Sequence, residues 1–299
     1  MNKTRMVIVT GASGFIGTHL VNRLLELEFD VIAVTRKLKR EAQIQRENLI
    51  WIEWSNLSDF LKSIPNTPIG IIHLATAYGR NGESLASVEE ANVMQPLQLL
   101  QLAVKYNIKK FLNADSFFGK PEFNYQYMRP YIITKDSFKM WGEYIANQTE
   151  LYFVNMRLEH VYGPGDGKDK FIPYIVGSLL NDKKHIECTD CTQKRDFIYV
   201  DDAVLAFITV LNEELPSNYL EFEVGCGISL PIKTFLEKLK SNLPKSKSVF
   251  KFGSVPQREN EILDSKANDS LSKTLGWKAC CDIDSGIVKL LNYKAVFLV

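Results

Sequence analysis

The sequence predicts an α/β protein with a doubly wound parallel sheet and a smaller C-terminal lobe. Strand patterns alternate with helix patterns through the first half of the chain, as in parallel sheets that carry helices on both faces. A glycine-rich turn, Gly11–Gly17, follows the first strand, and the pair Tyr131 and Lys135 opens a helix after the fifth. Together these observations predict a Rossmann sheet, which binds a dinucleotide at the carboxyl ends of its strands.

The first four strands are predicted from short apolar runs. Residues 6–10 form a buried-strand pattern that ends at the glycine turn, and leucines at helical spacing follow that turn. Three more runs predict strands over residues 30–34, 49–54 and 69–75, with a short helix before the last of them.

The later elements continue this alternation. A helix is predicted over residues 85–106, a strand over 110–114, a helix over 131–148 and a strand over 152–156. After Tyr162 a Gly/Pro-rich loop begins and shorter helices follow, over residues 171–180, 201–211 and 231–243. Residues 1–162 are therefore predicted to form the cofactor-binding domain. Residues 163–299 are predicted to form mainly a substrate-binding lobe, with some segments that return to the main sheet.

Composition excludes several classes of function. The net charge is +1, so no bulk field attracts nucleic acid or anionic membrane. No stretch reaches the length of a membrane span, and a cytosolic location is the default expectation. Cys188 and Cys191 resemble half of a zinc site, but no second Cys/His pair follows at metal spacing. No metal site is therefore expected, and the cysteines are read as reduced thiols.

The glycine turn predicts a dinucleotide site. A side chain at Gly11, Gly14 or Gly17 would block the pyrophosphate or the contact between helix and strand. The N–H groups at the start of the following helix suit phosphate oxygens. A purely structural turn is the alternative. The residues expected to contact the cofactor are Gly11, Ser13, Gly14, Phe15, Ile16, Gly17, Thr35, Arg36, Ala75, Tyr131 and Lys135.

The end of the second strand favours NADP(H) over NAD(H). NAD-binding folds usually have Asp or Glu there, which accepts a hydrogen bond from the ribose 2′-hydroxyl. This chain has Thr35-Arg36-Lys37 instead. The planar guanidinium of Arg36 suits a 2′-phosphate. The alternative is a solvated charge run that continues to Lys39 and Arg40.

Tyr131 and Lys135 are candidates for proton transfer. They are four residues apart, so they share one face of a helix. A nearby ammonium favours the phenolate form of a tyrosine and is expected to lower its pKa from about 10. This interpretation of the pair is stronger because the pair follows the fifth strand of a dinucleotide-binding fold.

With these two motifs, three further runs make the chain resemble an extended short-chain dehydrogenase/reductase of the nucleotide-sugar epimerase/dehydratase branch. They are residues 157–164, residues 195–202 and the triplet Leu275-Gly276-Trp277. A narrower likeness, in residues 78–80, 158–163, 166–171 and 258–261, is to synthases of CDP-dideoxyhexoses. Those enzymes use NADPH to reduce the 4-keto group of CDP-4-keto-3,6-dideoxyglucose for the O-antigen of bacterial lipopolysaccharide.

The resemblance also implies contacts to substrate and to a second subunit. Arg195 and Arg258 would bind the pyrophosphate of a sugar nucleotide, as guanidinium groups do well; surface ion pairs are the alternative. His160 stands where the family often has Asn, so it either hydrogen-bonds substrate or packs in the core. A homodimer is expected through the helices over residues 85–106 and 131–148.

One departure from the family concerns the catalytic hydroxyl. The family usually has Ser or Thr where this chain has Ala114. Ser116, two residues further along a strand, returns to the same face and is the expected substitute. Asp115 matches an acid of the sugar dehydratases, but the Glu that follows it there is Ser116 here.

The sequence therefore predicts an NADPH-dependent reductase of a nucleotide-linked 4-keto-deoxyhexose. Tyr131 would donate the proton, Lys135 would tune it and bind ribose, and Ser116 would polarise the carbonyl. The configuration formed at C4 stays open. One rival is a nucleotide-sugar 4-epimerase that retains its cofactor, and another is a non-catalytic nucleotide-sensing or scaffold protein.

Overall fold

The computed structural model describes residues 5–38, 46–80 and 82–293. Its central element is a seven-stranded sheet in the order β11–β6–β5–β4–β1–β2–β3. β1 pairs in parallel with β2 and β4, and parallel pairing continues to β3 on one side and β5 on the other. The predicted Rossmann sheet is confirmed. Its strands are β1 (Met6–Thr10), β2 (Asp30–Thr35), β3 (Leu49–Glu53), β4 (Gly70–His73), β5 (Lys110–Ser116), β6 (Tyr152–Leu158) and β11 (Tyr219–Val224).

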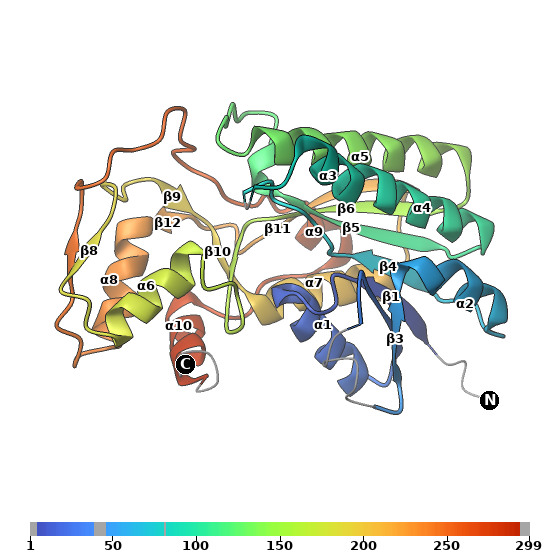
Figure 1. Ribbon diagram of the computed structural model, residues 1–299, viewed down its shortest axis with the longest axis horizontal. Coiled ribbons are helices and arrows are strands. Elements are labelled where there is room, and N and C mark those ends of the chain that lie inside the picture. Colours follow the sequence, from blue (N-terminus) through green and yellow to red (C-terminus); the bar gives the residue numbers. More distant parts are fainter. Residues whose placement is uncertain (1–4, 39–45, 81, 294–299) are drawn as a thin grey trace. The chain divides into compact units, whose positions relative to one another are not determined.

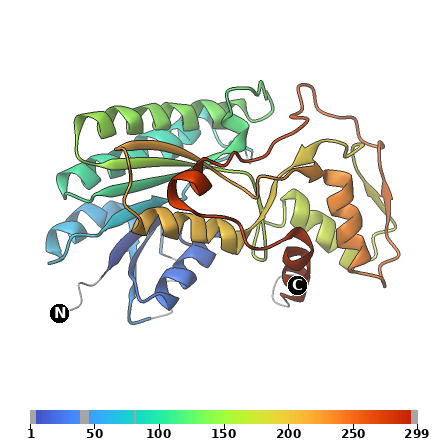
Figure 2. The same cartoon turned by 180° about the vertical axis from the view of Figure 1, so that it is seen from behind.

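Helices cover both faces of this sheet, as Figures 1 and 2 show. α2 (Leu57–Ser63), α4 (Gln95–Lys105) and α5 (Arg129–Gln148) lie on one face, and α1 (Phe15–Glu26) and α7 (Val200–Asn212) lie on the other. The strand order reverses between β1 and β4. The turn after β1 therefore lies at the switch point where such sheets bind ligands.

Aromatic rings fill the space between the sheet and α5. Phe111 of β5 stacks on Phe153 of β6 with centroids 5.6 Å apart, and Phe138 of α5 lies 5.8 Å from Phe111. All three side chains are fully buried. A Cβ at Gly142 would overlap the Phe153 ring, so this glycine lets α5 approach the sheet. The packing fixes the start of α5, which carries Tyr131, against the sheet.

Two predicted elements end or break differently in the structure. β3 stops at Glu53, and Trp54 begins a single 3₁₀ turn, η2 (Trp54–Asn56). The predicted helix over 85–106 consists of α3 (Leu85–Glu89), a π-helical segment η3 (Glu90–Met94) and α4. Apolar spacing did not reveal the π segment because one wider turn barely changes the periodicity.

The chain divides into two compact units. The first contains the residues up to Lys120, Met128–Arg157 and Val204–Phe222, and the second contains Pro121–Tyr127, Leu158–Ala203 and the chain from Glu223 onward. β11, which follows the predicted boundary at residue 162, joins the seven-stranded sheet. No helix in the described ranges is long and apolar enough to cross a membrane.

The second unit contains short strand pairs around a small core. In that core, Phe197 stacks on Phe235 with centroids 4.1 Å apart. The parallel pairs are β7 (His160–Tyr162) with β10 (Phe197–Tyr199) and β8 (His185–Glu187) with β13 (Val249–Lys251); the antiparallel pair is β9 (Lys194–Arg195) with β12 (Leu230–Pro231). The helices are α6 (Phe171–Leu180), α8 (Ile232–Ser241), α9 (Ser270–Leu275) and α10 (Ile283–Asn292).

Candidate active site

The turn between β1 and α1 needs its glycines. Gly11 has φ +67°, and a Cβ there would lie 2.7 Å from the amide nitrogen of Ala75. A Cβ at Gly17 would overlap the carbonyl oxygen of Gly11. Gly14, which has no side chain to cap a helix, precedes α1, and the first turn of α1 contains no acidic residue. The N–H groups that open α1 therefore suit phosphate oxygens, and the turn fits a dinucleotide.

The residues around this turn are held by β1 and β4. The N–H of Ala75 donates to Thr10 Oγ1 over 3.4 Å, and the same oxygen lies 2.7 Å from His73 Nδ1. Burial, and then the charge of Lys135, lowers the pKa of His73 well below its usual value, so this histidine is neutral and structural. Of the other turn residues that are predicted to contact the cofactor, Ser13 is exposed, and Phe15 and Ile16 are half-buried.

Cations lie at the end of β2. Arg36 and Lys37 are exposed, and the Thr35 hydroxyl donates to the carbonyl of Lys37 over 3.1 Å. Glu53, at the end of β3, accepts a hydrogen bond from the N–H of Leu38 over 2.9 Å. This bond holds the short turn that presents Arg36. The rest of the charge run, Lys39 and Arg40, lies outside the described residues.

Tyr131 lies in the first turn of α5, beside the carboxyl end of β5. Its side chain is buried, and its phenol lies within hydrogen-bonding reach of the side chains of Ser116 and Thr76. Lys135 Nζ lies 6.0 Å from the centroid of the Tyr131 ring and donates to the carbonyl of Ala114 over 2.8 Å. The structure therefore brings the three predicted catalytic residues together within the first unit.

Burial dominates the ionisation of this cluster. It raises the pKa of Tyr131 well above its usual value, Tyr78 and Asp115 raise it further, and hydrogen bonds to two hydroxyls oppose the shift. The pKa of Lys135 is lowered to about 8, mainly by burial. The expectation that Lys135 moves the phenol toward neutral pH is wrong for this structure, because burial penalises the phenolate and the groups that lower the pKa are the hydroxyls of Ser116 and Thr76, not the ammonium. The result is a protonated phenol, which is the form that donates a proton.

Asp115 is held in a polar network of its own. Its Oδ2 accepts a hydrogen bond from Asn155 Nδ2 over 2.7 Å and lies 3.7 Å from Arg157 Nε, and all three side chains are buried. Ser116 instead reaches the phenol of Tyr131. The geometry therefore favours Ser116 over Asp115 as the substitute for the hydroxyl that is missing in this chain.

Thr76 and Asn92 were missed by the sequence reasoning. Thr76 follows β4, and Asn92 lies in the π-helical segment with 1% of its surface exposed. Asn92 Oδ1 accepts from Thr76 Oγ1 over 3.2 Å and from the N–H of Ala77 over 2.7 Å. One signal was available: Asn92 shares its helix face with Val88 and Leu99, which are apolar and buried. A single amide on an apolar face requires buried partners.

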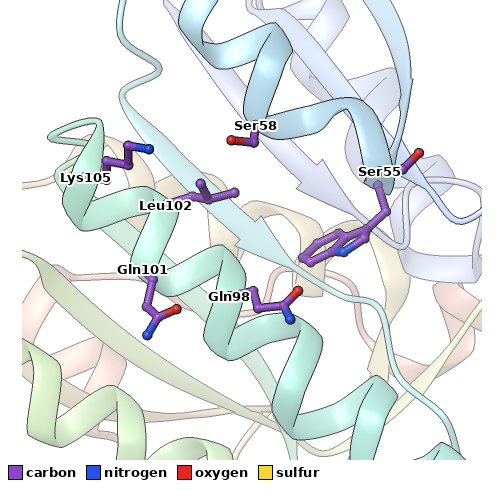
Figure 3. A pocket seen from close by; sticks show the side chains of 7 residues that line it. Ser55, Ser58, Gln98, Gln101, Leu102 and Lys105 are labelled. Atoms are coloured by element: carbon purple, nitrogen blue, oxygen red, sulfur yellow. The ribbon is translucent and has the colours of Figure 1, made fainter.

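A separate cavity of about 440 Å³ lies between α4 and the segment formed by η2 and α2 (Figure 3). Its lining is Trp54, Ser55, Ser58, Gln98, Gln101, Leu102 and Lys105. The resembled family often has an aspartate near adenine at the end of its third strand. This chain has the indole of Trp54 at that position.

Arg258, in the second unit, is exposed and braced by two tyrosines. Its Nη1 donates to the Tyr125 hydroxyl over 3.1 Å, and its guanidinium carbon lies 3.8 Å from the centroid of the Tyr127 ring. A planar cation stacked on an aromatic face loses little freedom on binding an anion. The arrangement suits a phosphate-binding group.

Arg195 has a different environment in the same unit. It is 5% exposed, and its Nη2 bonds Glu261 Oε1 over 2.6 Å. Its Nη1 donates to the carbonyls of Lys194 and Ile262 over 2.7 Å each. Because its charge is matched within the chain, these contacts favour Arg258 over Arg195 as the direct phosphate ligand.

His160 is half-buried on the ring of Phe197, with centroids 5.0 Å apart. Burial, followed by the charges of Arg195 and Lys170, lowers its pKa to about 3. The imidazole is therefore neutral at physiological pH. It is suited to packing or to a neutral hydrogen bond, and both alternatives from the sequence stay open.

The cysteines are free thiols. Cys188 and Cys191 are buried. Within the part of the chain that the structure describes, no group of three or more His, Cys, Asp or Glu residues could hold a metal ion.

Known proteins match this chain over most of its length. The model of the NAD dependent epimerase/dehydratase family matches residues 7–225. A protein named CDP-abequose synthase from Salmonella typhimurium is 49% identical over 96% of this chain and 97% of its own. Another of that name, from Salmonella muenchen, is 36% identical over 98% and 99%. A solved structure, MoeE5 in complex with UDP-glucuronic acid and NAD, has a TM-score of 0.80 and 24% identity, and the match covers 95% of this chain and 97% of that one.

Proposed function

Because the chain belongs to the NAD dependent epimerase/dehydratase family, we propose that it reduces the 4-keto group of CDP-4-keto-3,6-dideoxyglucose with NADPH to form CDP-abequose. The buried cluster of Tyr131, Ser116 and Lys135, next to a turn that fits a dinucleotide, carries this proposal. The 49% identity to a CDP-abequose synthase, over nearly the whole chain, supports the CDP-linked sugar. The proposed role in O-antigen synthesis follows from the family resemblance of the sequence.

In the proposed reaction the chain binds both partners and supplies one proton. The N–H groups at the start of α1 hold the pyrophosphate, and Arg36 holds the 2′-phosphate. When bound, NADPH supplies a hydride to C4. The Tyr131 O–H bond breaks as its proton passes to the carbonyl oxygen, and C4 becomes an alcohol carbon. Ser116 donates a hydrogen bond to the same oxygen, while the Lys135 ammonium offsets the phenolate and binds ribose.

The second unit supplies the proposed substrate contacts. Arg258 binds the pyrophosphate of the sugar nucleotide. Arg195 is held in place by its ion pair with Glu261 and contributes to this binding from that fixed position. His160, as a neutral imidazole, offers one hydrogen bond to the sugar nucleotide.

The test is NADPH consumption with enzymatically prepared CDP-4-keto-3,6-dideoxyglucose, followed by NMR of the product at C4. A galacto product supports the proposal, and a gluco product means a paratose-type reductase. Turnover of CDP-hexoses without added NADPH would identify a 4-epimerase instead. No hydride transfer with any sugar nucleotide would point to a sensing or scaffold protein.

The rate is expected to fall as pH rises through about 8. Lys135 has a pKa of about 8. Because the lysine is charged below this value and neutral above it, the cation beside the phenol is lost on the alkaline side. A pH profile of kcat measures this fall. In Lys135→Arg the guanidinium stays charged, so the pH profile of any residual activity is expected to show no fall near pH 8. The same fall in Lys135→Arg and in the parent would contradict the assignment of this pKa to Lys135.

We further propose a cytosolic homodimer. α5 exposes Ile133, Met140, Trp141 and Tyr144, whose spacing places them along one side of the helix. α4 lies beside α5 and exposes Val104. Aromatic residues and methionine are enriched in the cores of protein interfaces, which supports these helices as the contact.

The double variant Trp141→Glu/Tyr144→Glu is expected to be monomeric, because two carboxylates would be buried in the contact without partners. Sedimentation velocity measures the change. Ile228→Glu, at an apolar residue of the second unit that is 73% exposed, is the matched control and should remain dimeric. A dimeric double variant would exclude these helices as the interface.

A further inference from the structure

A path of hydrogen bonds runs from Thr76, beside the Tyr131 phenol, to the backbone of Tyr131. The phenol lies within hydrogen-bonding reach of the Thr76 side chain, and Thr76 Oγ1 donates to Asn92 Oδ1 over 3.2 Å. Asn92 Nδ2 donates to Thr134 Oγ1 over 3.0 Å. Thr134 Oγ1 then donates to the carbonyl of Tyr131 over 2.9 Å. The path joins the loop after β4, the π-helical segment and α5.

The backbone of Ala77 sets the direction of this path. Its N–H donates to Asn92 Oδ1 over 2.7 Å, and its carbonyl accepts from Asn92 Nδ2 over 2.8 Å. An N–H can only donate and a carbonyl can only accept, so the Asn92 amide has one orientation. Its Oδ1 must then accept from the Thr76 hydroxyl. The lone pairs of Thr76 Oγ1 are left to accept from Tyr131.

Any charge on the phenol forms in a dry environment. Tyr131 is 5% exposed, and the ring of Tyr78 stacks on it with centroids 5.3 Å apart and 22° between planes. A hydrogen bond to a charged oxygen is worth more where water is excluded. At Ala114 the chain lacks the hydroxyl that polarises the carbonyl in the resembled family, and Ser116 is the proposed substitute in that role.

We propose that Thr76 is a further catalytic residue, whose hydroxyl stabilises the phenolate of Tyr131 while Ser116 polarises the substrate carbonyl. When Tyr131 gives its proton to the substrate oxygen, one O–H bond breaks and one forms. The Thr76 hydroxyl then turns from Asn92, to which it holds by a long 3.2 Å bond, and donates to the phenolate. No covalent bond of Thr76 changes. This inference rests on the proposed reductase function.

The first experiment compares Thr76→Val with Thr76→Ser. The valine keeps the shape and loses the hydroxyl, so kcat is expected to fall about 10-fold to 100-fold, with the NADPH dissociation constant unchanged. The serine should stay close to the parent. Thr274→Val, at an exposed threonine of α9, is the matched control. Parent-like kcat in Thr76→Val would overturn the proposal.

A second readout needs no turnover. A fluorinated tyrosine incorporated at position 131 ionises at lower pH than tyrosine, and its fluorine NMR signal reports the pH of ionisation. Thr76→Val is expected to raise that pH by about one unit, and Thr76→Ser is not. An unchanged value would overturn the role of Thr76 even if no substrate is found. A shifted value in a chain that reduces no keto sugar would instead overturn only the proposed reaction.

Discussion

Replacement of Tyr131 by phenylalanine is expected to remove nearly all reductase turnover and to leave NADPH binding intact. The phenylalanine keeps the ring that stacks on Tyr78 and lacks only the hydroxyl. General acid catalysis contributes roughly 100-fold to 10,000-fold, so kcat should fall by a factor in that range. Stopped-flow NADPH oxidation measures the rate, and fluorescence titration measures the dissociation constant of NADPH.

Tyr174→Phe is the matched control for this change. Tyr174 is 42% exposed on α6, and its hydroxyl accepts a hydrogen bond from Lys183 over 2.9 Å. Its loss should leave kcat unchanged. Near-normal turnover in Tyr131→Phe would remove the phenol from the mechanism. Equal loss of turnover and of NADPH binding would mean that the hydroxyl supports the cofactor site and not proton transfer.

The sequence predicted the sheet well because buried parallel strands require apolar runs. β1 and β5 both begin at the predicted residue, although β5 continues two residues further, to Ser116. That extension matters, because Ser116 lies at the strand end beside Tyr131. The motif of Tyr131 and Lys135 was visible because helical spacing of four places both on one face.

The sequence could not predict which groups surround the phenol. Thr76 and Asn92 are 16 residues apart and meet through the π-helical segment, which apolar spacing does not indicate. The raised pKa of Tyr131 depends on its burial, which only the packed structure sets. The same holds for Arg195: its partner Glu261 lies 66 residues away, so the sequence could not show that this ion pair is buried.

Loss of the Arg36 guanidinium is expected to weaken NADPH binding about 10-fold to 100-fold and to leave NADH binding unchanged. Hydrogen bonds to charged groups contribute about 1.5–3 kcal/mol, and 1.4 kcal/mol corresponds to about tenfold in affinity. Only NADPH has the 2′-phosphate that Arg36 would bind. Titration of Arg36→Ala with both cofactors measures the difference. This titration decides the proposed preference for NADPH.

Two comparisons make the Arg36 result specific. Lys37→Ala removes the adjacent exposed cation and should cost less, because an ammonium is a point charge without the planar fork. Equal losses for NADPH and NADH in Arg36→Ala would mean that Arg36 supports a part that both cofactors share.

If the parent chain prefers NADH, Glu53 becomes the expected partner of the ribose 2′-hydroxyl. Glu53 pairs with Thr35 across the strand ends, and its Oε1 already holds the N–H of Leu38. In that case Glu53→Gln should weaken NADH binding, whereas the proposed NADPH preference predicts that it does not.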